Sequence, residues 1–205
     1  MSRGLDTFLI TGANRAVWQN RCMFETSERV VAEEVVLVDE EDREWGVASK
    51  LAAHEGSGRL HRAFSVFVFD SAGRLLLQRR AAGKYHFGGL WTNTCCGHPR
   101  PGEDVLQAAS RRLWEEMGIA PELERATSFV YEAFDPASGL AEREYDHVLR
   151  GRYDGDPVPD PEEAEGWAWV DPKELAADLS ENAEGYTPWF PLAAERLCLD
   201  AERAG

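Results

Sequence analysis

The segment from Gly97 to Ile119 constrains the fold more than any other part of this sequence. A glycine is followed by Glu103 and then, after a spacer, by the run Arg111-Arg-Leu-Trp-Glu-Glu-Met-Gly-Ile. Apolar residues recur at helical spacing between 103 and 117, and Gly118 supplies a C-terminal stop. The preceding stretch, 81–101, contains glycine and proline and shows no period. We therefore expect an ordered loop that leads into a helix over 103–117.

Short apolar or alternating runs predict β-strands on both sides of this loop–helix unit. The stretch 70–73 has the composition of a tight turn between two of them. Asp171-Pro172 and Thr187-Pro188 are each typical of a helix start. The pattern predicts an α+β fold in which mixed β-sheets are flanked by helices. The expected strands are 35–38, 64–69, 75–77, 126–134, 142–150 and 167–170.

A chain of 205 residues is long enough for one domain with a full core and too short for two comfortable ones. Residues 1–33 show no sustained period, and we expect them to form an extension outside the core fold. The domain is expected to span 34–200, followed by a short tail, 201–205. No internal repeat is present.

Charge and composition narrow the classes of partner. The formal net charge is −15, which argues against nucleic acid and anionic membranes, because both require a basic face. No run approaches the roughly 18 apolar residues of a membrane span, and no signal peptide is visible. The four cysteines make a poor disulfide framework. We expect a cytoplasmic, reduced protein, a monomer or a weak homo-oligomer, that acts on a small molecule.

If this acidic chain binds an anionic substrate, its few lysine and arginine side chains must be concentrated at the binding site. Several of them fall in or near the loop–helix unit, which is where an anion would bind. These residues are Lys50, Arg79, Arg80, Lys84, Arg111 and Arg112.

The histidines and glutamates suggest a metal site without defining it. Glu115 and Glu116 point about 100° apart on a helix, so only one of them needs to face a pocket. Glu142 and Glu144 lie two apart on a predicted strand and share a face. With His54, His61 and His98 they would form a mixed nitrogen and oxygen set, which suits Mn²⁺ or Zn²⁺ better than Mg²⁺. Spacing alone does not assemble this set, and His86 and His147 are expected to be structural or surface residues.

Cys96 has two interpretations. A buried free cysteine is usually an inert small apolar residue. A thiol beside a metal and a positively charged site instead has a lowered pKa and becomes reactive. Cys95 has no motif support and is expected to pack in the core.

Many short motifs in order resemble the type 1 isopentenyl-diphosphate Δ-isomerases of the Nudix superfamily, over about 35–197. The 97–119 segment is nearly the Nudix box, a loop–helix unit that holds a divalent cation against a diphosphate. It departs from the hydrolases at Arg112, where they have a glutamate. Gly88 departs from the family, which has proline before Gly-Leu-Trp. The motifs are Lys50-Leu-Ala-Ala-His54, Arg59-Leu-His61-Arg-Ala-Phe64, Arg79-Arg80-Ala, Trp91-Thr-Asn-Thr-Cys-Cys96-Gly-His98-Pro, the box helix, Tyr131-Glu-Ala, Glu142-Arg-Glu144 and Thr187-Pro188-Trp189.

The resemblance implies an enzyme that interconverts isopentenyl and dimethylallyl diphosphate in a Nudix-like domain. Proton transfer would involve Cys96 and Glu144, assisted by Tyr131, while Trp189 would face a carbocation. Glu116 would hold a Mg²⁺ that enters with the diphosphate. The other roles implied are a second divalent metal (Mn²⁺, Zn²⁺ or Mg²⁺) on His54, His61, His98, Glu142 and Glu144, and diphosphate binding by Lys50, Arg80, Lys84 and Arg112.

Two other functions compete with isomerisation. A Nudix hydrolase of a nucleoside or other diphosphate would need a glutamate where Arg112 stands, and it has no need of a Cys96/His98 pair. A non-catalytic module that binds a prenyl diphosphate would be favoured if Cys96 or Glu144 were missing, and both are present. The identity of the metal and the oligomeric state are left open by the sequence.

Overall fold

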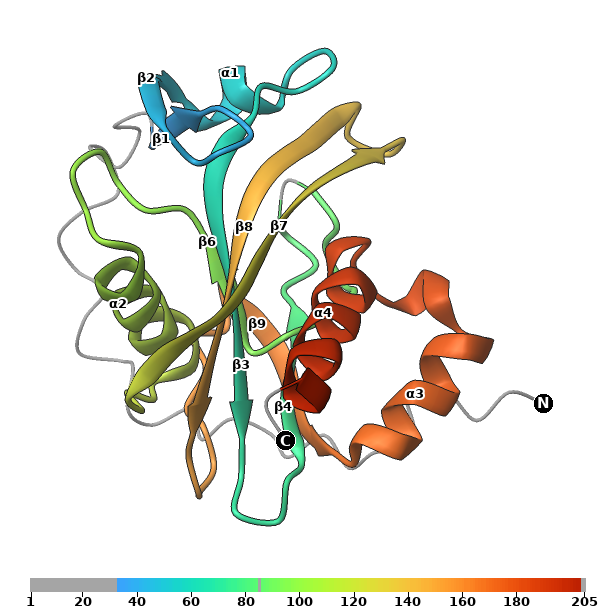
Figure 1. Cartoon of the computed structure of the whole chain (residues 1–205). Helices are drawn as coiled ribbons and strands as arrows, with labels where there is room; N and C mark the ends of the chain where they lie inside the picture. Colours follow the sequence, from blue (N-terminus) through green and yellow to red (C-terminus); the bar gives the residue numbers. More distant parts are fainter. Residues whose placement is uncertain (1–32, 85, 204–205) are drawn as a thin grey trace, which may run out of the picture.

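A mixed nine-stranded β-sheet forms the centre of the molecule, with α2 on one face and α4 on the other (Figure 1). The computed structural model describes residues 33–84 and 86–203, with side chains through Leu197. The strands are β1 (Glu34–Val38), β2 (Glu44–Ser49), β3 (His61–Phe69), β4 (Leu75–Arg80), β5 (Trp91–Thr92), β6 (Cys95–Gly97), β7 (Leu123–Asp135), β8 (Leu140–Arg152) and β9 (Ala164–Val170). The helices are α1 (Lys50–His54), α2 (Val105–Met117), α3 (Pro172–Glu181), the 3₁₀-helix η2 (Ala183–Gly185) and α4 (Trp189–Arg203).

Strand β3 organises the sheet. It pairs antiparallel with β1, β4 and β6 and parallel with β8, while β8 forms a long hairpin with β7. Strand β9 adds to β4. The predicted α+β domain with a mixed sheet flanked by helices is confirmed.

Helix α2 forms where the sequence predicted it, because both ends carry strong capping signals. The Asp104 side chain accepts hydrogen bonds from the backbone N–H groups of Leu106 and Gln107. Gly118 ends the helix in the left-handed region with φ 65°, and a Cβ there would lie 2.7 Å from the Val158 carbonyl oxygen. The apolar side of α2, which includes Leu113, packs on the sheet. The helix therefore packs against β3 and β6.

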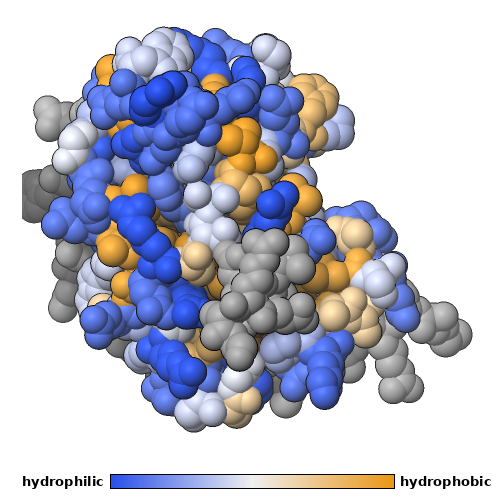
Figure 2. Space-filling model, in the orientation of Figure 1, coloured by the Kyte–Doolittle hydropathy of each residue, from blue (hydrophilic) through white to orange (hydrophobic). Residues whose placement is uncertain are grey.

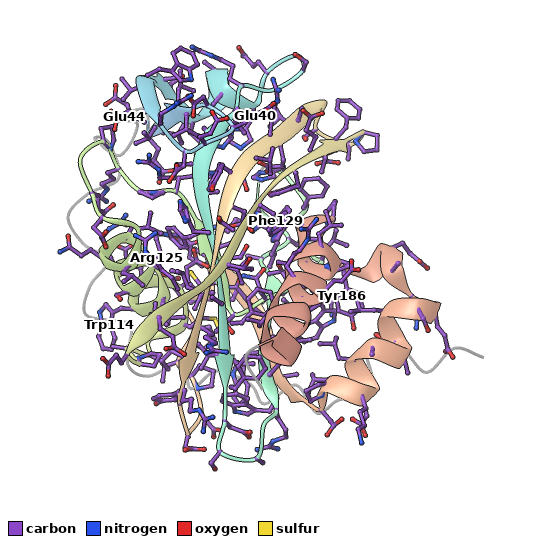
Figure 3. All side chains as sticks on the ribbon, in the orientation of Figure 1. Glu40, Glu44, Trp114, Arg125, Phe129 and Tyr186 are labelled. Carbon is purple, nitrogen blue, oxygen red and sulfur yellow. The ribbon has the colours of Figure 1, made fainter. Side chains whose placement is uncertain are left out.

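A second core lies on the opposite face, between the sheet and α4. It is rich in aromatic side chains and includes Phe67, Phe129 and Phe190. Figure 3 shows Phe129 and Tyr186 on this α4 side, whereas Trp114 and Arg125 lie toward α2. The aromatic core is the part of the fold that borders the site described below.

Several expected boundaries differ from the structure. Two short strands, β5 and β6, lie within the stretch 81–101 that was predicted to be loop. Strand β2 and helix α1 were not predicted. The last helix begins at Trp189, two residues after the start expected near Thr187, and runs through Arg203. The extension expected over 1–33 lies, apart from Glu33, outside the described residues.

The face seen in Figure 2 is largely hydrophilic, with small hydrophobic areas between the charged groups. Large apolar side chains that are exposed, such as Trp45 and Phe134, belong to β2 and β7. Among the described helices, none combines the length and apolar character needed to cross a membrane.

Candidate active site

Four histidines and two glutamates converge at one end of the sheet. His54 is the last residue of α1, His61 is the first of β3, and His98 follows β6. Strands β3 and β8 run parallel with His61 in register with Glu144, so these two side chains lie beside each other. His54 and His61 are both fully buried. The structure therefore brings together the five residues expected to form a metal site.

The distances are those of a compact donor cluster. His54 Nε2 lies 2.8 Å from Glu142 Oε2, and His98 Nε2 lies 2.8 Å from Glu144 Oε1. His61 Nε2 is 3.1 Å from His98 Nε2 and 3.4 Å from Glu144 Oε1. One nitrogen or oxygen from each of His54, His61, His98 and Glu144 lies within 4.8 Å of the others. This group could hold one metal ion.

Backbone carbonyls orient two of the imidazoles. His54 Nδ1 is 2.6 Å from the Lys50 carbonyl oxygen, and His61 Nδ1 is 2.8 Å from that of Arg59. In a neutral ring the hydrogen then sits on Nδ1, and the Nε2 lone pair is directed into the cluster. Burial also lowers the pKa of His98 to about 4, so this ring is neutral near pH 7. Imidazole nitrogens and carboxylate oxygens that face one another in a buried cluster form a donor set that fits a divalent metal.

His86 is an additional member of the cluster. Its Nε2 lies 2.5 Å from Glu142 Oε1, and its ring centroid is 5.7 Å from that of His54. His54, His86 and Glu142 form a second group of donors within 4.8 Å of one another. The sequence reasoning missed this residue. The signal that could have found it is its place in the loop between Lys84 and Cys96, both of which were expected in the site.

His147 lies on the other face of β8, because it is an odd number of residues away from both Glu142 and Glu144. Its Nε2 is 3.0 Å from Asp42 Oδ2. It is not a member of either donor group.

The Glu144 carboxylate also reaches the aromatic core. Tyr131 lies opposite Glu144 in the β7–β8 hairpin, and its hydroxyl donates to Glu144 Oε2 at 2.5 Å. Trp189 begins α4, and its Nε1–H donates to Asn93 Oδ1 at 3.2 Å. The Tyr131 and Trp189 ring centroids are 6.4 Å apart. One carboxylate thus joins the polar cluster to an aromatic wall.

Cys96 lies on β6, paired with Ser65 of β3, and its side chain packs against the aromatic core. Arg80 Nη1 is 3.7 Å from its Sγ, and the Arg80 guanidinium lies 5.5 Å from the Trp189 ring centroid. Burial raises the pKa of the Cys96 thiol to about 12, although Arg80 opposes this shift. Cys95 is buried in the α2-side core, as expected of a packing residue.

The third part of the site is a group of cations beside α2. Arg112 Nη2 lies 2.5 Å from Glu116 Oε1 and 3.1 Å from Glu163 Oε1. Lys84 forms an ion pair with the same Glu163. Gln78 donates to Glu116 Oε2 at 3.0 Å, and Glu116 is buried. Of the two adjacent glutamates, Glu116 is therefore the one that faces inward.

The remaining expected cations are distributed between the site and the surface. Lys50 Nζ is 2.9 Å from Glu33 Oε2, and the pKa of Glu33 is lowered chiefly by Lys50, with smaller effects from Arg112 and His98. Lys50 begins α1, the helix that ends at His54 of the donor cluster. Arg79 and Arg111 instead form ion pairs with Glu165 and Glu103.

Known proteins are similar to this chain in sequence and in fold. The NUDIX domain model matches residues 59–190. The chain is 56% identical over 173 residues to isopentenyl-diphosphate Delta-isomerase 1 of Aromatoleum aromaticum, covering 83% of this chain and 97% of that protein. It is 52% identical to the isopentenyl-diphosphate Delta-isomerase of Serratia proteamaculans, covering 77% and 87%.

Solved structures agree in fold alone. A protein from Deinococcus radiodurans superimposes with a TM-score of 0.67 at 22% identity, covering 80% of this chain and 99% of that one. A MutT protein from Methanosarcina mazei gives a TM-score of 0.58 at 20% identity, covering 71% and 96%.

Proposed function

Because the chain belongs to the isopentenyl-diphosphate Delta-isomerase family of NUDIX-domain proteins, we propose that it interconverts isopentenyl and dimethylallyl diphosphate. The reaction would supply precursors for isoprenoid biosynthesis. The observation that carries this proposal is the position of Glu144, which contacts both the histidine cluster and Tyr131 in the aromatic core beside Cys96.

The diphosphate would bind at the cations beside α2. Lys84 and Arg112 both pair with Glu163, and Arg80, at the end of β4, and Lys50, at the start of α1, would add two further positive charges. Glu116 would hold the Mg²⁺ that accompanies the diphosphate, since Mg²⁺ is usually bound by one or two carboxylates plus substrate phosphates. Charge neutralisation at this end would leave the hydrocarbon end to enter the aromatic core.

Arg112 explains why the site would bind a diphosphate without cleaving it. Hydrolysis requires carboxylates that hold metal ions and activate water. Arg112 instead supplies guanidinium N–H groups, which match phosphate oxygens. The substitution favours isomerisation over the alternative of a Nudix hydrolase.

Moving the double bond by one carbon requires a proton to be added at one end and another to be removed at the neighbouring position. Cys96 and Glu144 are the proposed groups for these two transfers. Tyr131 would orient Glu144 and help relay its proton, as its hydrogen bond to Oε2 permits. The reaction is reversible, so each group acts as acid in one direction and as base in the other.

The intermediate is a tertiary carbocation, and it must be kept from water or it would be trapped as an alcohol. Trp189 is buried and would present its ring to this cation, an attraction that reaches about 2 kcal/mol when water is excluded. The aromatic residues Phe67, Trp91 and Phe129 are buried in the same core and would shield the cation from water on the α4 side.

The histidine cluster is proposed to bind one divalent ion, which would be Mn²⁺, Zn²⁺ or Mg²⁺, through His54, His61, His98, Glu142 and Glu144. When bound, the ion would supply the positive charge that holds the Glu144 carboxylate in place. Mn²⁺ and Zn²⁺ suit this set better than Mg²⁺, because three of the donors are imidazole nitrogens.

The direct test is to incubate the protein with isopentenyl diphosphate, Mg²⁺ and Mn²⁺ and to follow the products by NMR. We expect dimethylallyl diphosphate without release of phosphate. A parallel assay with nucleoside diphosphates should give no phosphate. Phosphate release without isomerisation would favour a hydrolase, and binding without either product would favour a non-catalytic module.

A further inference from the structure

His86 lies at the edge of the donor cluster and has no role in the proposed reaction. We infer that it is a positioning residue of the metal site, which acts by holding the Glu142 carboxylate in its ion-binding orientation. The inference rests on the proposed function only in taking the histidine cluster as a metal site.

The two oxygens of Glu142 face two different imidazoles. Oε2 lies 2.8 Å from His54 Nε2, and Oε1 lies 2.5 Å from His86 Nε2. Glu142 is only 3% exposed and His86 only 8%, so water cannot readily replace either contact. A hydrogen bond from His86 Nε2–H to Oε1 leaves Oε2 directed at His54, the residue that belongs to both donor groups.

The loop that carries His86 is held by the anion-binding end of the site. Arg80 donates from Nη2 to the His86 carbonyl oxygen and from Nε to the Phe87 carbonyl oxygen, both at 3.2 Å. The Phe87 ring packs edge-on against Trp189, with centroids 5.4 Å apart. His86 therefore has a fixed backbone on which its ring can orient Glu142.

The geometry favours positioning over direct ligation. His86 contacts Oε1 of Glu142 whereas His54 faces Oε2, and the donor group that contains His86 includes none of His61, His98 and Glu144. Metal-binding carboxylates are commonly held by a hydrogen bond from a second residue, and loss of such a partner typically weakens metal affinity by about 10–100-fold.

The test measures Mn²⁺ affinity by competition with a fluorescent chelator. His86→Ala should weaken binding by about 10–100-fold. His86→Gln keeps an N–H donor near the position of Nε2 and should restore most of the affinity. His147→Ala is the matched control, because His147 is also 8% exposed but bonds to Asp42 outside the cluster. It should bind Mn²⁺ like the wild type.

The Co²⁺ absorption spectrum separates the two roles. If His86 only positions Glu142, His86→Gln keeps the same ligands and the same band positions. Wild-type affinity in His86→Ala would overturn the inference. A failure of His86→Gln to restore affinity, together with shifted Co²⁺ bands, would also overturn it and identify a direct ligand. Isomerisation by the wild type is measured separately, so failure of the inference is distinguishable from failure of the proposed function.

Discussion

The Tyr131 hydroxyl donates to Oε2 of Glu144 at 2.5 Å, while Oε1 of the same carboxylate lies 2.8 Å from His98 Nε2. The antiparallel register of β7 and β8 places Tyr131 directly opposite Glu144. One side of the carboxylate therefore faces the histidine cluster and the other faces the aromatic core. The proton affinity of Glu144 would therefore depend both on the histidine cluster and on Tyr131.

Tyr131→Phe should lower kcat by about 100-fold, the lower range for loss of a positioned acid–base group. Metal content should not change, because the cluster side of Glu144 is untouched. Tyr145→Phe is the control, since Tyr145 contacts the Ser128 hydroxyl on the outer face of the hairpin. Steady-state kinetics and metal analysis check both variants. Wild-type kcat in Tyr131→Phe would remove Tyr131 from the reaction.

Arg112→Ala should raise KM for isopentenyl diphosphate by about 10–100-fold, since a hydrogen bond to a charged group contributes about 1.5–3 kcal/mol. Arg112→Lys should recover part of this loss, because it keeps the charge without the planar fork. The control is Arg150→Ala, which removes an exposed arginine paired with Glu124. An unchanged KM in Arg112→Ala would place the diphosphate elsewhere.

Gly88→Ala should lower the free energy of unfolding by about 1–3 kcal/mol, the usual cost of overpacking. A Cβ at this position would lie 2.8 Å from the Ala82 carbonyl oxygen, so the loop that carries Lys84 and His86 would have to move. The rate of isomerisation should fall as well, because this loop carries Lys84. Gly83→Ala is the matched control in the same loop, with nothing within 4 Å of the added Cβ. Urea unfolding measures both, and equal stability of the two variants would contradict the crowding argument.

The free energy of unfolding should depend on pH in part through the protonation of His147. Burial lowers its pKa below 6.5, although Asp42 opposes this shift. Protonation therefore favours the unfolded chain, so the stability that neutral His147 contributes is present above pH 6.5 and is lost as pH falls through the lowered pKa. Between about pH 8 and pH 5, the free energy of unfolding should fall less in His147→Gln than in the wild type. The difference should be at most about 1.4 kcal/mol for each unit by which the pKa of His147 is shifted. Parallel urea titrations that show the same pH slope in both chains would contradict this.

The sequence could predict those elements whose local signals are strong. Helix α2 has a capping aspartate, a regular apolar face and Gly118, and the β7–β8 hairpin has a run of turn residues, 135–139, between its two long strands. Strand β2 was missed because Trp45 and Val47 are exposed, so its residues do not alternate between a buried and a solvent face. The strands within 81–101 were missed because two or three residues are too few to show a period.

The candidate site was predictable mainly through resemblance to a family. The contact between His61 and Glu144 depends on a parallel pairing of β3 with β8, and no local pattern specifies which distant strands pair. Glu142 and Glu144 could be placed on one face by their spacing. The position of His86 between Lys84 and Cys96 in the sequence indicated that it lies near the site, but a single histidine in an aperiodic loop does not reveal its contact with Glu142.

The most direct test of the account is proton exchange from D₂O, followed by NMR with isopentenyl diphosphate as substrate. The wild type should form dimethylallyl diphosphate and incorporate deuterium at the carbons that gain and lose protons. Cys96→Ala should fail to convert the substrate while still binding the metal ion. Conversion by Cys96→Ala at the wild-type rate would contradict the claim that Cys96 and Glu144 exchange protons with the substrate in one pocket.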